Sequence, residues 1–580
     1  MYQDKPWLSF YEPHVSEHLD YPQTTIPAAL ARTAARHPDQ PMIIFKDRTL
    51  TYQQINAAAD RFAAALQGIG VEKGSRVAIH LPNCPQFAIA YFATLRLGAV
   101  VVPCNPVYTA REMSHQLNDS GAKVIVTLSA MFPLIKEIRD RTALEQVVVA
   151  QIKTYFPTML RLLFTLTAEK KRGHRVDISG EANTTWFQDL LKGAPERAAP
   201  ADVDGDDTAI LMYTGGTTGL SKGAQLTHEN ILVNAYQVRV WVDALDRPVT
   251  ILTALPLFHS YGLSTCLNPA ALGPGTMILV PDPRDVEDIL KTIHKHRPHM
   301  YPGVPALYVA INNHPDAAKY DLSSLDFCNS GAAPLPLEVQ RRFQELTGAR
   351  LVEGYGLSEA SPVTHGNPAY GESRIGTIGL PWPDTEVKIV DVETGENLVP
   401  VGEAGELCVR GPQVMKGYWN MPTETANALR PDPDGGRPWL YTGDIASMDE
   451  DGYFRIVDRV KDMILGAGGY NIYPREVEEV LFEHPRVLEA AVAGVLVEGK
   501  GERVKAFVVI KPGQKATEDE IRDFCRENLA PHKVPSFVEF LDELPKSQVG
   551  KVLRRELAAK ESEADDVGRG SAGDRSPGGG

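Results

Sequence analysis

The sequence predicts an α/β protein with a large N-terminal part of layered sheets and helices and a small α+β C-terminal part. Three observations predict this. Apolar runs of strand length alternate with helical patterns in the first half, the last hundred residues have a different pattern of helices and strands, and the composition is globular. The chain has 580 residues, of which 43% are hydrophobic and 23% charged, so it can bury a sizeable core.

Helices and strands alternate in the large part. Residues 52–69 have apolar positions at helical spacing, and residues 88–97 predict a second helix. The apolar runs 77–81, 124–128 and 208–213 have the length of buried strands. Because strands that alternate with helices form parallel pairs, we expect a sheet covered by helices on both faces.

The small part begins with a helix predicted over 474–484, which opens with a proline and ends in a His-Pro pair. The runs 488–496 and 505–510 predict strands. Thr517 and Glu520 form a capping box that opens a further helix, so a compact α+β module is expected. The tail at 561–580 is charged and rich in glycine and serine, and we expect it to be disordered.

Charge and cysteine content narrow the class of protein. The chain has 59 Lys and Arg against 74 Asp and Glu, a net charge of −15, which argues against nucleic acid as a partner because such binding uses cations to neutralise phosphates. The 6 cysteines lie far apart, without a CxxC or Cys/His cluster, which favours reduced thiols in a cytoplasmic protein. No signal-peptide pattern opens the sequence, and its longest apolar stretch, 87–103, is interrupted by Arg96 and too short to span a membrane.

The segment 155–175 combines an apolar helix with a basic end. Two interpretations are open. A surface helix can end in cations because they suit its C-terminal dipole, or the apolar face and basic end can lie on a membrane surface. The cations are Lys170, Lys171, Arg172, His174 and Arg175.

The strongest chemical signal is the run 213–223, which lies between the strand at 208–213 and a helix opened by Thr227. Its glycines let backbone N–H groups converge on one point and its hydroxyls add donors, so the run predicts a nest for phosphate oxygens. It is not a Walker A loop, because Lys222 follows Ser221 rather than glycine and no Ser or Thr comes after it. The predicted phosphate-binding residues are Thr214, Gly215, Gly216, Thr217, Thr218, Gly219 and Lys222.

These residues, in this order, resemble the phosphate loop of the acyl-adenylate-forming (AMP-binding) superfamily, which includes acyl-CoA synthetases, luciferases and peptide-synthetase adenylation domains. The resemblance covers residues 27–557, and two positions depart from the family pattern. Ser221 stands where proline is common and Ser358 where threonine is more usual, and neither change removes a hydrogen-bond donor. Six further motifs follow in the family's order: LPLFHSYG (255–262), NSGAAPL (329–335), EGYGLSE (353–359), YTGDIA (441–446), DRVKDMI (458–464) and PKSQVGK (545–551).

The resemblance implies an acyl-CoA synthetase-like fold with a mobile small domain. It divides the chain into an N-terminal AMP- and acyl-binding domain (1–458), a hinge (459–461), a C-terminal lid domain (462–560) and the tail. It implies that a carboxylate attacks ATP to give acyl-AMP and pyrophosphate, and that the thiol of coenzyme A then displaces AMP. Mg²⁺ and cations would screen the repulsion between carboxylate and ATP.

The resemblance also assigns the nucleotide site. Glu359 would hold Mg²⁺ with Thr214 as a further ligand, Tyr355 would stack on adenine, Asp444 would bind the ribose hydroxyls, and Arg459 would add a contact near ribose and phosphate. Judged from the residues alone, a loop carboxylate, a core tyrosine and a turn-capping aspartate are the alternatives for Glu359, Tyr355 and Asp444. The other predicted nucleotide-binding residues are Gly331, Ala332, Ala333, Glu353, Gly354, Gly356 and Ser358.

The remaining catalytic assignments depend on the family more heavily. Lys551 alone would be read as a solvated surface cation, but the family places this lysine between the substrate carboxylate and the α-phosphate. Lys461 would be the pivot that moves the lid between half-reactions. His259, otherwise a satisfied core histidine, would border and gate the acyl pocket. Gly468 and Gly469 would line the pantetheine tunnel.

The expected substrates are a long-chain fatty acid, ATP and coenzyme A. The small residues Gly262 and Ser264 after His259 permit a deep tunnel, and the segment 155–175 resembles an insertion of bacterial long-chain fatty acyl-CoA synthetases. Four alternatives remain open: a medium-chain or aryl-acid CoA ligase, a ligase that loads a carrier protein, a luciferase-like oxygenase, and a non-catalytic sensor. The oligomeric state is also open, with a homodimer as one candidate.

Overall fold

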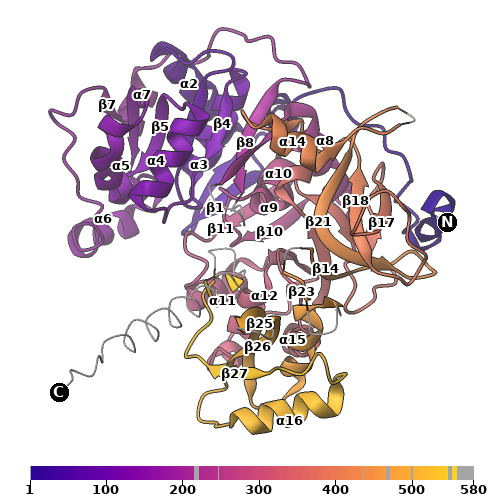
Figure 1. The fold of residues 1–580 in the computed structure, drawn as a ribbon. Coiled ribbons are helices and arrows are strands. Elements are labelled where there is room, and N and C mark those ends of the chain that lie inside the picture. The colour runs from indigo at the N-terminus through magenta and orange to yellow at the C-terminus, as the bar shows by residue number, and fades with distance from the viewer. Residues whose placement is uncertain are drawn as a thin grey trace, which may run out of the picture.

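The computed structural model describes residues 2–214, 221–245, 247–433, 435–460, 462–465, 471–497, 501–546, 552–554 and 556–557. Figure 1 shows a larger unit, coloured indigo to orange, above a smaller unit that the chain enters near β23 (Ile464–Leu465). The larger unit contains three sheets and the smaller one contains short sheets of its own. This is the α/β architecture with a small α+β unit that the sequence predicts.

The first sheet has eight strands, six of which form a parallel set. Buried residues alternate between its faces, as the period of a strand requires. Val77 and Ile79 join the core shared with α2 (Tyr52–Gly68) and α3 (Pro85–Arg96), whereas Ala78 joins the cluster of α4 (Ala110–Ser120) and α5 (Phe132–Ile138). The predicted sheet covered on both faces is therefore confirmed. In spatial order its strands are β19 (Gly417–Tyr418), β9 (Lys222–Thr227), β8 (Thr208–Thr214), β4 (Val100–Pro103), β3 (Arg76–His80), β5 (Val124–Leu128), β6 (Gln146–Ala150) and β7 (Thr184–Trp186).

The second sheet has nine strands and carries much of the site at its edge. The helices that lie between its strands in chain order include α8 (His228–Trp241), α11 (Val286–His296), α12 (Pro305–Asn312) and α13 (Leu337–Thr347). In spatial order its strands are β16 (Leu380–Pro381), β15 (Val363–Gly366), β14 (Arg350–Gly356), β13 (Phe327–Ser330), β12 (Met300–Gly303), β10 (Val249–Thr253), β11 (Gly275–Leu279), β1 (Pro41–Phe45) and β2 (Arg48–Thr51).

The third sheet and the small unit complete the fold. The third sheet is antiparallel and consists of β17 (Glu386–Val390), β18 (Gly405–Arg410), β20 (Leu429–Arg430), β21 (Trp439–Met448) and β22 (Phe454–Arg459). The small unit packs α15 (Pro474–Glu483) and α16 (Glu518–Asn528) on a sheet and has a hydrophobic core of its own. Its strands are β23, β24 (Asn471–Ile472), β25 (Val487–Val497), β26 (Gly501–Ile510) and β27 (Phe537–Phe540).

Most predicted elements are confirmed, and one differs. The helix over 52–69 is α2, and the capping box of Thr517 and Glu520 opens α16. The run after 208–213 does not lead straight into a helix, because β9 comes first and pairs antiparallel with β8. The predicted phosphate loop thus connects two strands of a hairpin.

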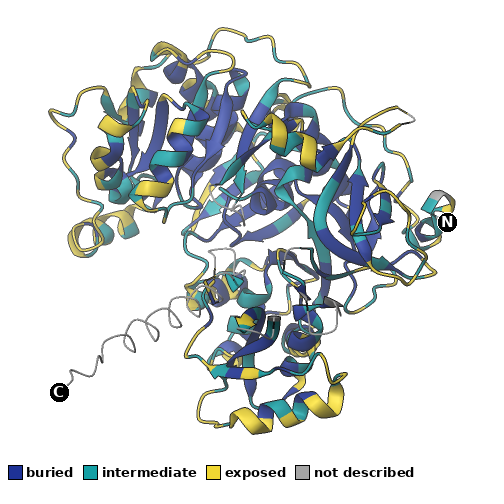
Figure 2. Ribbon diagram, in the orientation of Figure 1, coloured by how far each residue is buried: buried dark blue, intermediate teal, exposed yellow. Residues whose placement is uncertain are grey.

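Two further expectations concern the cysteines and the apolar segment 155–175. All six cysteines are free and buried, as predicted. The apolar helix of segment 155–175 is α6 (Thr158–Thr167), and Figure 2 shows it largely exposed at one end of the large unit. Among the described residues, no helix combines the length and apolar character needed to cross a membrane.

Candidate active site

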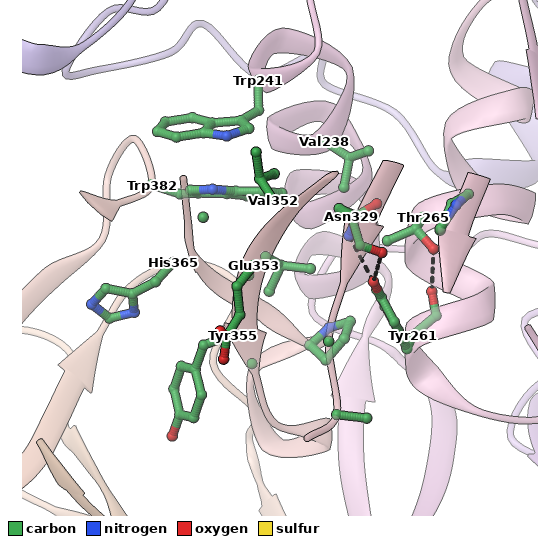
Figure 3. Close-up of a pocket in the computed structure, with 18 of the residues that line it drawn as sticks. Val238, Trp241, Tyr261, Thr265, Asn329, Val352, Glu353, Tyr355, His365 and Trp382 are labelled. Carbon is green, nitrogen blue, oxygen red and sulfur yellow. Dashed lines mark hydrogen bonds between the residues drawn. The ribbon is translucent and has the colours of Figure 1, made fainter. Parts of the chain in front are cut away.

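One cavity joins several of the predicted motifs. One end is lined by nucleotide-motif residues, including Gly331, Ala332 and the run 353–356. The other is apolar and is lined by Trp241 and Trp382, whose rings stack with centroids 5.5 Å apart. Figure 3 shows these two indoles above the strand that carries Glu353 and Tyr355. The site therefore lies where β13 and β14 end, the edge at which parallel strands usually bind ligands.

Tyr355, Asp444 and Arg459 meet although they come from three motifs. The Tyr355 hydroxyl donates to Oδ2 of Asp444 at 2.6 Å, and Nε of Arg459 lies 2.9 Å from Oδ1. Register explains the second contact, because Asp444 in β21 stands opposite Arg459 in β22. Burial, and then the Asp444 charge, raise the pKa of Tyr355 well above its usual value, so its hydroxyl stays protonated and donates.

Two glycines of the nucleotide motifs are required by close packing. A Cβ at Gly356 would lie 2.1 Å from the carbonyl oxygen of Pro362, and one at Gly331 would lie 3.1 Å from the Tyr261 ring. Ala332 adopts a φ of 68°, in the left-handed region. The Tyr261 hydroxyl donates to the carbonyl of Asn329 at 3.1 Å, which fixes the ring beneath this turn. The ends of β13 and β14 can therefore accept a flat ligand only because the residues at these positions are small.

The predicted metal ligand Glu359 has a tyrosine partner. Its Oε1 accepts a hydrogen bond from the Tyr418 hydroxyl at 2.8 Å. Nζ of Lys222 lies 5.4 Å from the centroid of the Tyr418 ring and forms an ion pair with Glu424. Thr214 stands opposite Lys222 in the β8–β9 hairpin. Glu359 and Lys222 therefore flank one ring.

His259 lines the cavity and also caps a short helix. Its Nδ1 accepts a hydrogen bond from the backbone N–H of Tyr261 at 3.2 Å. Next to it, the hydroxyls of Ser260 and Ser358 lie 3.1 Å apart, which ties this motif to EGYGLSE. Both sequence interpretations of His259 are therefore compatible with its position, since one ring nitrogen satisfies a structural role while the residue borders the cavity.

Several predicted residues lie outside the described residues. These are Gly215, Gly216, Thr217, Thr218, Gly219, Lys461, Gly468, Gly469 and Lys551. Their described neighbours are informative. Arg554, three positions after Lys551, contacts Asp458 at 3.3 Å, Asp462 at 3.4 Å and Glu478 at 2.6 Å. The chain segment that follows Lys551 is therefore tied to both sides of the predicted hinge.

Sequence reasoning missed four residues of the site: Tyr418, Trp241, Trp382 and Arg475. Arg475, in α15 of the small unit, brings its guanidinium 4.0 Å from the carboxylate of Glu353. Burial raises the pKa of Glu353 to about 7. No spacing rule connects residues so far apart in sequence, although the buried acid in EGYGLSE was a signal that a cation lay nearby. Within the described ranges, no group of three or more His, Cys, Asp or Glu residues is arranged to hold a metal ion.

Comparisons with known proteins agree with this geometry. The family model described as AMP-binding enzyme matches residues 30–419, and the model for the AMP-binding enzyme C-terminal domain matches residues 476–551. The chain belongs to the AMP-binding enzyme family.

Relatives of this AMP-binding enzyme match over nearly the full chain. The long-chain-fatty-acid–CoA ligase of Bacillus subtilis (strain 168) is 46% identical over 566 residues, which covers 97% of this chain and 99% of the relative. The ligase of the same name from Escherichia coli O157:H7 is 40% identical and covers 95% and 98%.

Solved structures give the same picture of the enzyme. The anthranilate CoA ligase AuaEII in complex with anthranoyl-AMP has a TM-score of 0.82 at 28% identity and covers 94% of this chain and 99% of its own. A long-chain-fatty-acid-CoA ligase (FadD1) from Archaeoglobus fulgidus has a TM-score of 0.67 at 26% identity, covering 92% and 99%.

Proposed function

We propose that this AMP-binding enzyme activates a long-chain fatty acid with ATP and transfers the acyl group to coenzyme A. In the first half-reaction the fatty carboxylate attacks the α-phosphate, forming acyl-AMP and releasing pyrophosphate. In the second, the thiol of coenzyme A attacks the acyl carbonyl, its proton is lost, and AMP leaves. The observation that carries the proposal is the cavity that is lined at one end by the nucleotide motifs and at its apolar end by Trp241 and Trp382.

We assign the individual residues the following roles. Tyr355 offers a ring beside the small residues of the 329–335 motif, for adenine. Asp444 would accept hydrogen bonds from the ribose hydroxyls, either in place of the bond from the Tyr355 hydroxyl or alongside it, and Arg459 would keep the Asp444 carboxylate in position. His259 would border the acyl group, and the 213–223 loop with Lys222 would take the phosphates. Lys551 would reach the reacting carboxylate during adenylation.

Mg²⁺ fits the residues at the phosphate end. Hard cations take oxygen ligands, and Glu359 offers a carboxylate close to the hairpin that carries Thr214, so these two would hold it together with phosphate oxygens. When bound, Mg²⁺ would neutralise charge that builds up on the phosphates. Tyr418, by donating to one oxygen of Glu359, orients the carboxylate.

Two chemistries in one site require a rearrangement, and we assign it to the small unit. The proposed boundaries are an N-terminal domain at 1–458, a hinge at 459–461 with Lys461 as pivot, and a lid at 462–560. Rotation of the lid would exchange Lys551 for the segment with Gly468 and Gly469, next to the pantetheine of coenzyme A. The separate core of the small unit supports this division, because a unit with its own core can move as a body.

Pyrophosphate release tests the proposed reaction. It should be measured with ATP and Mg²⁺ on fatty acids from two to twenty carbons and on several aryl acids, each with and without coenzyme A. Turnover that peaks on long chains and requires coenzyme A is expected. A peak on short or aryl acids would overturn the substrate assignment, and a single burst that coenzyme A cannot turn over would indicate a carrier protein. No release on any acid would overturn the enzyme activity itself.

A membrane-surface contact through α6 is the second part of the proposal. Met159, Leu162, Leu163 and Leu166 are 77%, 56%, 57% and 76% exposed, whereas Leu160 and Phe164 pack against the core. The exposed cations Lys170, Lys171, Arg172 and Arg175 follow the helix, although the chain as a whole is acidic. Apolar residues beside a basic cluster match the headgroups of an anionic bilayer.

Vesicle sedimentation tests this contact. Wild-type enzyme should bind vesicles that contain phosphatidylglycerol more tightly than vesicles of phosphatidylcholine alone. Leu162→Glu with Leu163→Glu should abolish the difference. Leu496→Glu, at a leucine that is 80% exposed on the small unit, is the matched control and should bind like wild type. Equal binding by the α6 variant and wild type would refute the assignment.

A further inference from the structure

Helix α4 faces both ends of the predicted phosphate loop. The loop follows Tyr213 in β8 and returns at Ser221, just before Lys222 opens β9. His115 and Asp119 lie four positions apart in α4, so they share one face of the helix. Nε2 of His115 lies 3.2 Å from the carbonyl oxygen of Ser221, and Oδ2 of Asp119 accepts from the Tyr213 hydroxyl at 2.5 Å.

In both contacts, His115 with Ser221 and Asp119 with Tyr213, the chemistry of the groups shows which one donates the hydrogen bond and which one accepts it. A carbonyl oxygen can only accept, so Nε2 of His115 carries the proton that it donates to Ser221. At the other end, burial, and then the neighbouring Asp119, raise the pKa of Tyr213. The tyrosine is therefore the donor and Asp119 the charged acceptor, an arrangement stronger than a neutral hydrogen bond.

Helix α4 is itself held in place by several contacts, so His115 and Asp119 have fixed positions. Thr109 and Glu112 form a capping box at its start, and the buried Gln116 donates to the carbonyl of Pro103 at the end of β4. A third tie runs through Trp419, whose Nε1 donates to the carbonyl of Asp119 while its backbone N–H donates to Gly223. The base of the hairpin is thus connected to α4 from several sides.

We propose that His115 and Asp119 are positioning residues that fix Ser221 and Tyr213, which flank the phosphate loop, in place for the binding of ATP. They act through Ser221 and Tyr213 and touch no substrate themselves. Flanking residues that are fixed in advance lower the conformational entropy lost on binding, and this gain appears as affinity for the phosphates. The inference rests on the proposed ATP-dependent activity.

Steady-state kinetics with His115→Ala, His115→Gln and Tyr213→Phe tests the proposal. His115→Ala and Tyr213→Phe should each raise KM for ATP about five- to tenfold, the size expected for one lost hydrogen bond. Values of kcat and of KM for the fatty acid should stay within about twofold of wild type. His115→Gln should recover most of the affinity, because its amide can still donate to the Ser221 carbonyl.

Asn118→Ala is the matched control. Asn118 lies on the same helix and also donates to a carbonyl, that of Arg141 at 2.9 Å, but away from the loop. This variant should leave KM for ATP unchanged. If Asn118→Ala and His115→Ala behave alike, or if His115→Ala raises KM for every substrate equally, the residues are only structural and the proposal is wrong.

Calorimetric titration with ATP separates this proposal from the proposed function. Wild-type enzyme that binds no ATP would overturn the ATP-dependent activity itself. Wild-type enzyme that binds ATP while His115→Ala, folded by its circular dichroism, binds it equally well would refute only the role of α4. Weaker binding by His115→Ala than by Asn118→Ala supports it.

Discussion

The guanidinium of Arg475 lies 4.0 Å from the carboxylate of Glu353, which connects the small unit to the edge of the cavity. Arg475 also donates to the carbonyl of Ile456 at 2.6 Å, and its backbone N–H donates to Asp458 at 2.9 Å. One arginine of the small unit thus contacts β14 and β22 of the large unit. Its contacts are specific to this relative arrangement of the two units.

Replacing Glu353 should change how stability depends on pH. Burial raises the pKa of Glu353 from 4.5 to about 7, so between these values the folded protein holds a proton that the unfolded chain releases. The carboxyl's contribution to stability is therefore present below pH 4.5 and is lost as pH rises to about 7. Glu353→Gln should remove this slope. Relative to wild type, the variant should gain up to about 3 kcal/mol between pH 5 and pH 8, since one pKa unit corresponds to about 1.4 kcal/mol. Urea unfolding at the two pH values checks this, and parallel curves would contradict it.

Lys551→Ala should separate the two half-reactions. Adenylation should fall by a factor on the order of 100 to 1,000, the usual loss when one charge-stabilising donor is removed, whereas thioester formation from supplied acyl-AMP should continue. Lys461→Pro should do the reverse, because it stiffens the proposed pivot. Lys546→Ala, a nearby lysine paired with Glu489, should leave both steps intact. Equal loss of both half-reactions in both variants would rule out the pivot.

Arg554→Ala should loosen the small unit. The substitution leaves Asp458 and Glu478, both buried, without the guanidinium that lies between them. Breaking one side of a buried charge cluster usually costs about 3 to 5 kcal/mol, so thermal unfolding should split into two transitions with the small unit first. Arg486→Ala removes an exposed pair with Glu520 and should shift the midpoint little. A single transition at the wild-type temperature for Arg554→Ala would contradict the prediction.

Trp382→Leu should shift the acyl preference toward longer chains. Trp382 stacks on Trp241 at the apolar end of the cavity, so a smaller side chain leaves space for about two more methylene groups. At about 0.8 kcal/mol per buried methylene, kcat/KM for the longest acids relative to the shortest should rise roughly tenfold. Trp439→Leu, a buried tryptophan of the third sheet, is the control and should leave the profile unchanged. If Trp382→Leu lowers kcat/KM equally for all acids, the acyl chain binds elsewhere.

The sequence predicts the layered α/β fold and the candidate nucleotide-site residues because these depend on local patterns. Continuous apolar runs predicted β3, β5 and β8, helical spacing predicted α2, and the motifs named Glu359, Tyr355 and Asp444 as candidates. The β8–β9 hairpin was missed, since the run after Lys222 lacks the continuous apolar character of the parallel strands. That the loop continues into a strand is set by pairing with β8, which is a tertiary property.

The residues that the sequence could not indicate are those whose partners are distant. Tyr418 meets Glu359 from 59 positions away and Arg475 meets Glu353 across two units. Trp241 and Trp382 come from different elements and form one wall only when α8 lies beside the end of β16. Neither spacing nor composition connects such pairs. The motifs identify which groups do chemistry, whereas the chain's packing determines which groups orient them.

The six buried cysteines have a practical consequence for following the lid. Burial raises the pKa of the Cys84 thiol to about 12 and that of Cys525 to about 11, and none of the six is exposed. A thiolate is the reactive form, so maleimide dyes should leave the native enzyme unlabelled. One cysteine introduced on each unit, for example at Leu496 and at Leu398, would then accept a dye pair selectively. Distance changes between the dyes during turnover would test the proposed lid rotation in single molecules, without removing any native thiol.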